Sequence, residues 1–128
     1  MPRAIVRPTE AELDVLRVIW ERGPSTVRQV LDALAATRPV GYTTILKTMQ
    51  IMAEKGLVTR DESQRTHIYA ARYAQHKTQA QLVRDLLERA FGGSAPALVM
   101  QTLAAGKVSS EEVQAIRRLL DQLEGERK

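Results

Sequence analysis

The sequence predicts a mainly α-helical chain with a small β-hairpin wing, that is, a winged helix-turn-helix followed by a helical dimerisation region. Residues up to 56 contain three segments with helical apolar spacing, and two short β-prone runs follow them. From residue 75 onward the spacing is helical again. We therefore expect a winged helix-turn-helix domain over residues 1–74 and a helical dimerisation domain over residues 75–128.

The first helix is expected to begin at a capping box. Thr9 can accept a hydrogen bond from the backbone, and Glu12 follows three residues later, as a Thr-x-x-Glu box requires. Apolar residues then recur at helical spacing as far as Trp20, and Gly23 followed by Pro24 ends the segment.

A second helix is expected to take Ser25 as its cap and to bury an apolar face that includes Val30 and Leu34. It must end before Pro39, because the residue before a proline rarely stays helical. The stretch from Pro39 to Gly41 then forms a short turn to a third helix.

The third helix is the segment around which the chain is organised. At about 100° per residue, Ile45, Met49 and Met52 fall on one face, which suits a core. The opposite face and one flank carry Thr43, Lys47, Gln50, Glu54, Thr44, Thr48 and Ile51. Hydroxyl, amide and ammonium groups of this kind bind phosphate oxygens and base edges. The alternative is an ordinary amphipathic helix whose polar face is only solvated.

A hairpin is expected directly after this helix. Gly56 can close the helix in a left-handed turn. Residues 57–60 and 66–70 then predict two short strands, and the polar stretch 61–65 predicts the loop between them. Two strands are not stable alone, so we expect this wing to lie against the helices.

The C-terminal half is expected to associate with a second copy of the chain. One helix should end at Gly92, a second should be capped by Ser94, and a third should open with a capping box at Ser109. These helices carry more apolar surface than a segment of about 50 residues can bury alone. The expected interface residues are Leu82, Leu86, Val113, Ile116, Leu120 and Leu123. The alternative is that this half folds back onto the first domain.

Composition narrows the possible functions. The absence of cysteine removes disulfides and cysteine metal sites, and an aromatic content of 4% argues against a stacking platform for single-stranded nucleic acid. No apolar run approaches the roughly 20 residues of a membrane span, and no signal peptide is evident. A cytoplasmic protein without direct membrane insertion is therefore expected. The net charge of +4 suits a polyanionic partner.

No enzymatic activity, cofactor or metal site is expected. The sequence contains no Ser-His-Asp set, glycine-rich phosphate loop or suitably paired carboxylates. His67 and His76 have no cysteine or nearby histidine with which to complete a zinc site.

Five stretches, taken in order, resemble one known family. They are Thr9–Trp20, Tyr42–Ile45 (Tyr-Thr-Thr-Ile), Met52–Val58, His67–Tyr69 and Leu98–Met100. Over nearly the whole chain they are similar to the penicillinase-repressor family of bacterial transcriptional regulators, the BlaI/MecI/CopY type. The resemblance implies a winged helix that binds double-stranded operator DNA and a helical half that holds a homodimer. The dimer would bind inverted repeats and repress transcription.

The resemblance also implies how such a repressor is released. In members that respond to β-lactam antibiotics, a membrane-bound sensor leads to cleavage in the dimerisation half, so a sensor-linked protease is an expected partner. The cleaved bond is commonly an Asn-Phe pair, whereas an ungapped match places Gln101 and Thr102 there. The protease would have to accept a different pair. Copper-responsive relatives carry a C-terminal cysteine cluster, which this chain lacks.

The third helix supplies most of the expected DNA contacts. Lys47 is the first candidate, because it projects from the first turns of the presented face. Threonines there can contact phosphate oxygens or a thymine methyl group, and a glutamine can pair with adenine. The expected set is Tyr42, Thr43, Thr44, Lys47, Thr48, Gln50 and, from the hairpin loop, Arg65. Arg60, on the other side of that loop, is a weaker candidate.

Two other functions stay open from the sequence. A winged helix that binds only protein would present an apolar or acidic face, against which Thr43, Lys47 and Gln50 argue. A regulator switched directly by a small ligand would need a pocket between the two halves. The operator sequence, the regulated genes and the inducing signal do not follow from the residues.

Overall fold

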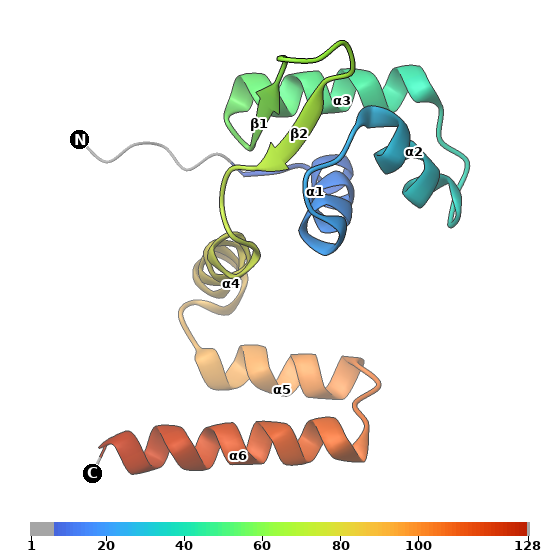
Figure 1. Cartoon of the computed structure of the whole chain (residues 1–128). Coiled ribbons are helices and arrows are strands. Elements are labelled where there is room, and N and C mark those ends of the chain that lie inside the picture. The colour runs from blue at the N-terminus through green and yellow to red at the C-terminus, as the bar shows by residue number, and fades with distance from the viewer. Residues whose placement is uncertain (1–6, 128) are drawn as a thin grey trace, which may run out of the picture. The chain divides into compact units, whose positions relative to one another are not determined.

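The computed structural model describes residues 7–127 and contains six α-helices and two β-strands within that range (Figure 1). In chain order they are α1 (Glu10–Arg22), α2 (Val27–Ala35), α3 (Tyr42–Lys55), β1 (Val58–Asp61), β2 (Ile68–Ala71), α4 (Gln75–Phe91), α5 (Ala95–Ala105) and α6 (Ser110–Arg127). Three helices followed by a hairpin and then by further helices confirm the predicted fold class, a winged helix-turn-helix with a helical C-terminal region.

The chain divides into two compact units, one that reaches Leu82 and one that begins at Val83. Helix α4 runs through this division. The expected domain boundary after residue 74 stays a prediction. The outermost parts of the two expected domains, residues 1–6 and 128, lie outside the described residues.

Helix α1 begins at the capping box that the sequence predicts. The Thr9 hydroxyl accepts a hydrogen bond from the Glu12 backbone N–H at 3.2 Å, and the Glu12 carboxylate accepts one from the Thr9 N–H at 2.8 Å. The helix ends at Gly23, whose φ of 93° lies in the region that favours glycine.

Helix α2 is capped by Thr26, so the prediction that Ser25 caps it is wrong. The Thr26 hydroxyl accepts from the Gln29 N–H, and the Gln29 side chain accepts from the Thr26 N–H. Ser25 has a different role. It is fully buried, and its backbone exchanges two hydrogen bonds with that of Tyr69, at 2.9 and 2.8 Å. The connection between α1 and α2 is therefore tied to the wing.

The wing is an antiparallel hairpin in which Val58 pairs with Ala71 and Asp61 pairs with Ile68. Both strands start later than the sequence indicates, at 58 and 68 instead of 57 and 66. At the first strand the reason is the end of α3. Gly56 adopts a left-handed conformation (φ 83°), and the Leu57 N–H bonds back to the Met52 carbonyl at 2.9 Å. The Leu57 N–H therefore belongs to the helix end.

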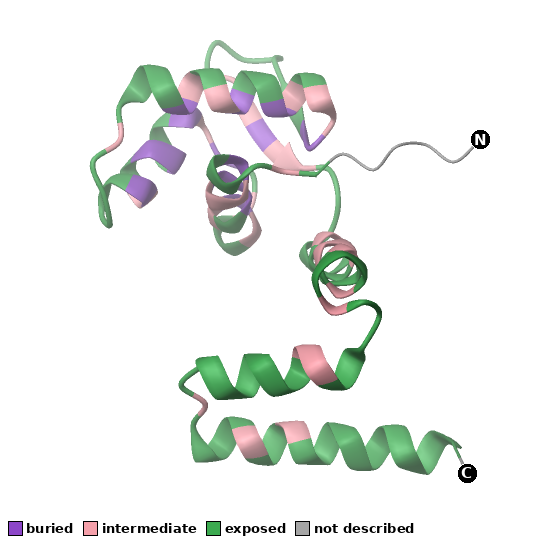
Figure 2. Ribbon diagram, turned by 180° about the vertical axis from the view of Figure 1, so that it is seen from behind, coloured by how far each residue is buried: buried purple, intermediate pink, exposed green. Residues whose placement is uncertain are grey.

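The hydrophobic core lies in the first unit (Figure 2). It is formed by one face each of α1, α2 and α3 together with the first residue of β1, Leu57 before it and one tyrosine of β2. Its buried members are Val15, Leu16, Ile19, Val27, Val30, Leu31, Leu34, Ile45, Met49, Met52, Leu57, Val58 and Tyr69. Because all three helices contribute, packing in the core fixes the orientation of α3 relative to α1 and α2.

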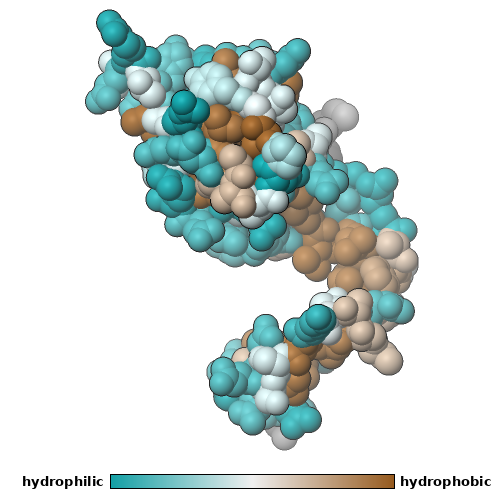
Figure 3. Space-filling view, turned by 90° about the vertical axis from the view of Figure 1, so that its right-hand side faces the viewer, coloured by the Kyte–Doolittle hydropathy of each residue, from teal (hydrophilic) through white to brown (hydrophobic). Residues whose placement is uncertain are grey.

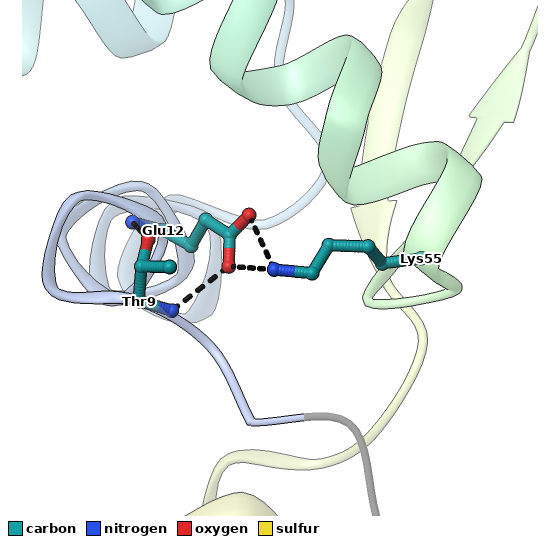
Figure 4. Close-up of polar contacts among 3 residues, drawn as sticks. All are labelled: Thr9, Glu12 and Lys55. Atoms are coloured by element: carbon teal, nitrogen blue, oxygen red, sulfur yellow. Dashed lines mark hydrogen bonds and ion pairs between the residues drawn. The ribbon is translucent and has the colours of Figure 1, made fainter.

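An ion pair joins α1 to the end of α3 (Figure 4). The Glu12 side chain is only 5% exposed, and its two oxygens lie 2.8 and 3.0 Å from Lys55 Nζ. One of these oxygens also accepts the Thr9 N–H, so the carboxylate has three hydrogen bonds. A buried carboxylate needs such partners, and here they hold the C-terminal turn of α3 against the start of α1.

Helices α4, α5 and α6 differ from the first three because no described residue in them is buried. The starts of α5 and α6 follow the predicted caps. The Ser94 hydroxyl accepts from the Ala97 N–H, and Ser109 forms a reciprocal capping box with Glu112. Within residues 7–127, no helix combines the length and the apolar character needed to cross a membrane.

Candidate nucleic-acid interface

Helix α3 is the element best suited to present side chains to DNA. Its inner face is fully packed, with Ile45, Met49 and Met52 at most 4% exposed. Seven of its other residues, on the opposite side and at its N-terminal end, are exposed: Tyr42, Thr43, Thr44, Lys47, Gln50, Ile51 and Glu54. The buried face thus determines which side chains point outward, as the sequence predicts.

The start of α3 leaves its first backbone N–H groups without a side-chain cap. Gly41 is the N-cap residue and has no side chain that could accept a hydrogen bond. Unpaired N–H groups at a helix N-terminus attract negatively charged oxygens. Tyr42, Thr43 and Thr44 form the first turn of the helix, are exposed, and each carry a hydroxyl group. The arrangement suits a phosphate oxygen.

Lys47 is the charged group that α3 offers at the middle of its exposed face. The other lysine of the helix, Lys55, is engaged by the Glu12 carboxylate. Glu54 is exposed on the same side of α3 as Lys47. A carboxylate in that position repels phosphate but can accept a hydrogen bond from cytosine N4. The face therefore combines one free-standing cation with groups able to discriminate between bases.

Thr48 differs from the other predicted contacts. It is half-buried, and its hydroxyl donates a hydrogen bond to the Thr44 carbonyl at 2.8 Å. That bond occupies its one donor and turns the hydroxyl toward the helix backbone. The sequence could not show this, because a threonine within a helix can direct its hydroxyl either way.

The two arginines of the wing, Arg60 near the end of β1 and Arg65 in the loop, have different surroundings. Arg60 donates a hydrogen bond to Glu62 at 2.9 Å, and the Tyr69 hydroxyl together with Glu62 raises the pKa of the Arg60 guanidinium. Arg65 is exposed in the loop. Hydrogen bonds from the hydroxyl and the backbone N–H of Ser63 lower the pKa of Asp61, which orders the loop while Asp61 is ionised. Arg65 is therefore better placed than Arg60 to reach a ligand.

The structure thus brings six predicted DNA-contact residues together on α3 and places the seventh, Arg65, on the wing loop. The predicted contacts left out two exposed residues of α3, Glu54 and Ile51, of which Ile51 is 39% exposed. The sequence does show an isoleucine among polar residues at this position. Helical periodicity alone places that residue on a flank of the helix and does not indicate a contact.

A shallow apolar hollow lies elsewhere in the first unit. Its lining residues come from α1, the α1–α2 connection and the end of the wing: Ile19, Trp20, Gly23, Pro24, Ala70, Ala71, Arg72, Tyr73 and Ala74. Its volume is about 310 Å³, and it is open to solvent. The ligand-switched alternative expects a pocket between the two halves and stays a prediction. No group of three or more metal-ligating side chains gathers within residues 7–127.

The expected dimer residues lie on α4 and α6. Leu86, Leu120 and Leu123 are 47%, 58% and 49% exposed. Leu82, Val113 and Ile116 are half-buried. Figure 3 shows hydrophobic surface over the helices of the second unit. The expected cleavage pair, Gln101 and Thr102, is exposed within α5, and the Thr102 hydroxyl donates to the Leu98 carbonyl at 2.8 Å.

Comparison with known proteins gives consistent similarities. A family described as Penicillinase repressor matches residues 8–122. "Transcriptional regulator BlaI" of Mycobacterium tuberculosis is 35% identical over 122 residues, which cover 94% of this chain and 87% of that protein. "Penicillinase repressor" of Bacillus licheniformis is 21% identical, with 98% of both chains covered.

Solved structures with a similar fold are known. A MarR family protein from Bacillus stearothermophilus superposes with a TM-score of 0.50 at 18% identity, over 92% of this chain and 74% of the other. At this identity the likeness concerns the fold alone.

Proposed function

The chain belongs to the penicillinase repressor family of transcriptional regulators, and we propose that it represses transcription by binding inverted-repeat operator DNA as a homodimer. The observation that carries this proposal is the exposed face of α3. Its opposite face is locked into the core by Ile45, Met49 and Met52, so the outward side chains are held in a fixed array. Preorganised helices of this kind enter the major groove.

The roles of the individual residues follow from their chemistry. Lys47 binds a guanine edge or a phosphate, Gln50 pairs with adenine, and Thr43 and Thr44 bind phosphate oxygens near the open N-terminus of α3. Arg65 of the wing loop contacts the DNA backbone beside the groove. The exposed polar face with its lysine favours this function over a winged helix that binds only protein.

The unburied apolar surface of the second unit supports a homodimer. No described residue of α4, α5 or α6 is buried, although these helices carry many leucines and valines. Apolar surface of this extent is stabilised when a second chain covers it. The interface residues we assign are Leu82, Leu86, Val113, Ile116, Leu120 and Leu123.

Cleavage in α5 is the release mechanism we propose, by a protease linked to a sensor. Binding of one half-site raises the effective concentration of the second winged domain at the other half-site. A cut at Gln101-Thr102 would separate α6 from the rest of the chain and remove this gain. Both residues are exposed, but they lie in a helix, so the bond becomes accessible only when α5 opens locally.

The proposal is tested with duplexes that carry an inverted repeat enriched by the full-length protein from a randomised pool. We expect tight binding to this site and weaker binding to a scrambled duplex of the same composition. Because phosphate contacts release counterions, log affinity should fall with log salt by about 0.9 for each neutralised phosphate. Equal affinity for both duplexes at physiological salt would contradict a sequence-specific repressor.

A further inference from the structure

Two neighbouring side chains, one half-buried and one exposed, carry methyl groups along one flank of the exposed face of α3. Thr48 and Ile51 are three residues apart, so they lie next to each other along the helix. Ile51 lies four residues after Lys47 and is therefore its neighbour on the helix surface, and Thr48 lies on the far side of Ile51 from Lys47.

The hydrogen bond of Thr48 determines which part of its side chain faces outward. Its hydroxyl donates to the Thr44 carbonyl at 2.8 Å and is directed at the helix backbone. The methyl group on the same β-carbon is then the part of the side chain left to contact a ligand. Thr48 therefore acts as an apolar residue at this position.

Ile51 is exceptional within the first unit. Among the described residues up to Leu82, it is the one large aliphatic side chain that is exposed, at 39%. The other exposed large hydrophobic residues there are the aromatic Tyr42 and Tyr73. Because a β-branched side chain keeps essentially one χ1 rotamer in a helix, its methyl groups are held in place before any ligand binds.

We propose that Thr48 and Ile51 form a methyl-reading contact that selects thymine in each operator half-site. The inference rests on the proposed function and deepens it. In the major groove thymine alone presents a C5-methyl group, and apolar side chains recognise it by contact. Ile51 lies seven residues after Thr44, or about 10 Å along the helix axis, which corresponds to about three base-pair steps. The selected thymine therefore lies within the stretch of groove that α3 spans.

The first test removes only the methyl group from the DNA. In an operator enriched by the full-length protein, each thymine is replaced in turn by deoxyuridine, which keeps the pairing edge and the O4 acceptor. We expect one position in each half-site where the replacement weakens binding about fourfold, as the burial of one methyl group predicts. The same replacement should leave the affinity of the double variant Thr48→Ser/Ile51→Ala unchanged, because both contacting methyl-bearing side chains are then shortened. Gln50→Ala, on the other side of the exposed face, is the matched control and should keep the methyl dependence.

The second test distinguishes the contribution of the Thr48 methyl group from that of its hydroxyl. Thr48→Val keeps both branches of the β-carbon but removes the hydroxyl, and it should bind operator like the unmutated protein. Thr48→Ser keeps the hydroxyl but removes the methyl group, and it should bind about fourfold more weakly per half-site. The reverse order would assign Thr48 a hydrogen bond to DNA and overturn its part in the contact.

The outcomes also separate this inference from the proposed function. If no sequence is enriched from the pool, the repressor function itself fails. If an operator is enriched and bound specifically, but no thymine methyl group affects its affinity, the inference alone is overturned. Methyl dependence that survives in the double variant Thr48→Ser/Ile51→Ala would also overturn it, because a residue outside the pair would then make the contact.

Discussion

At the scale of single residues, we expect the substitution of Lys47 to have the clearest effect on DNA binding. If its ammonium group reads a base, Lys47→Ala should weaken operator binding by about 1–3 kcal/mol and leave binding to scrambled DNA little changed. If it contacts phosphate, affinity should fall on all sequences and the salt slope should drop by about one. Equilibrium titrations at several salt concentrations measure both quantities.

The matched control for Lys47 is Lys107→Ala, which removes the same charge from an exposed lysine between α5 and α6. This variant tests whether lower net charge alone weakens binding. Operator affinity of Lys47→Ala equal to that of Lys107→Ala, with folding intact, would mean that α3 presents a different face to DNA.

The ion pair between Glu12 of α1 and Lys55 of α3 should contribute to stability, because its carboxylate is buried and its lysine is only partly exposed. Lys55→Met leaves the Glu12 carboxylate, 5% exposed, without its cation, so we expect a loss of about 2–3 kcal/mol. Glu12→Gln leaves instead a lysine that is 31% exposed and can reach water, so its cost should be about 1 kcal/mol. Urea unfolding at one fixed protein concentration measures both, and an equal cost for the two variants would contradict the asymmetry.

At the scale of elements, the sequence predicted the start of a helix correctly at Thr9, Ser94 and Ser109. Thr9, Ser94 and Ser109 all cap the helices expected of them. The prediction at α2 failed because Ser25 and Thr26 are adjacent and either could cap the helix. Which of them does so depends on a contact with Tyr69 of the wing. The backbone of Ser25 pairs with Tyr69, and this pairing over more than 40 residues leaves the cap to Thr26.

The candidate interface could be predicted from sequence only in part, for a similar reason. Helical periodicity separated Lys47 from Met49, since burial follows the angle around the helix axis. It could not show the direction of the Thr48 hydroxyl or the pairing of Lys55 with Glu12 on α1. Both depend on which acceptor lies within reach in three dimensions.

At the scale of the whole molecule, the expected dimer makes the C-terminal helices essential for tight DNA binding. Leu120→Asp places a charge where a leucine that is 58% exposed in the single chain would be covered by the partner. Burial of a leucine contributes roughly 1.5–3 kcal/mol, and burial of an unpaired charge costs more. We expect a monomer in sedimentation experiments, with the winged unit still folded and operator binding weakened.

Gln122→Asp is the control for that variant, because it adds the same charge to α6 two residues away, on a different side of the helix. It should remain dimeric. A monomeric unmutated protein at micromolar concentration would contradict the dimer itself.

A truncated chain tests release by cleavage without knowledge of the protease. Ending the chain after Gln101 removes the end of α5, residues 102–105, and all of α6, including Val113, Ile116, Leu120 and Leu123. The winged unit keeps every buried core residue, since all of them lie before residue 70. It should therefore stay folded and still contact a single half-site. What it should lose is the gain in affinity that comes from linking two half-sites.

The matched control ends after Leu123 and keeps the apolar residues of α6, so it should bind operator like the full chain. The two truncations separate loss of α6 from loss of a C-terminal tail. Titration of both against the same inverted repeat gives the comparison. If the chain ending at Gln101 binds as tightly as the full protein, a cut there cannot release the DNA. Because the argument requires only that the two half-sites become unlinked, it needs neither a ligand pocket nor a change in the shape of α3.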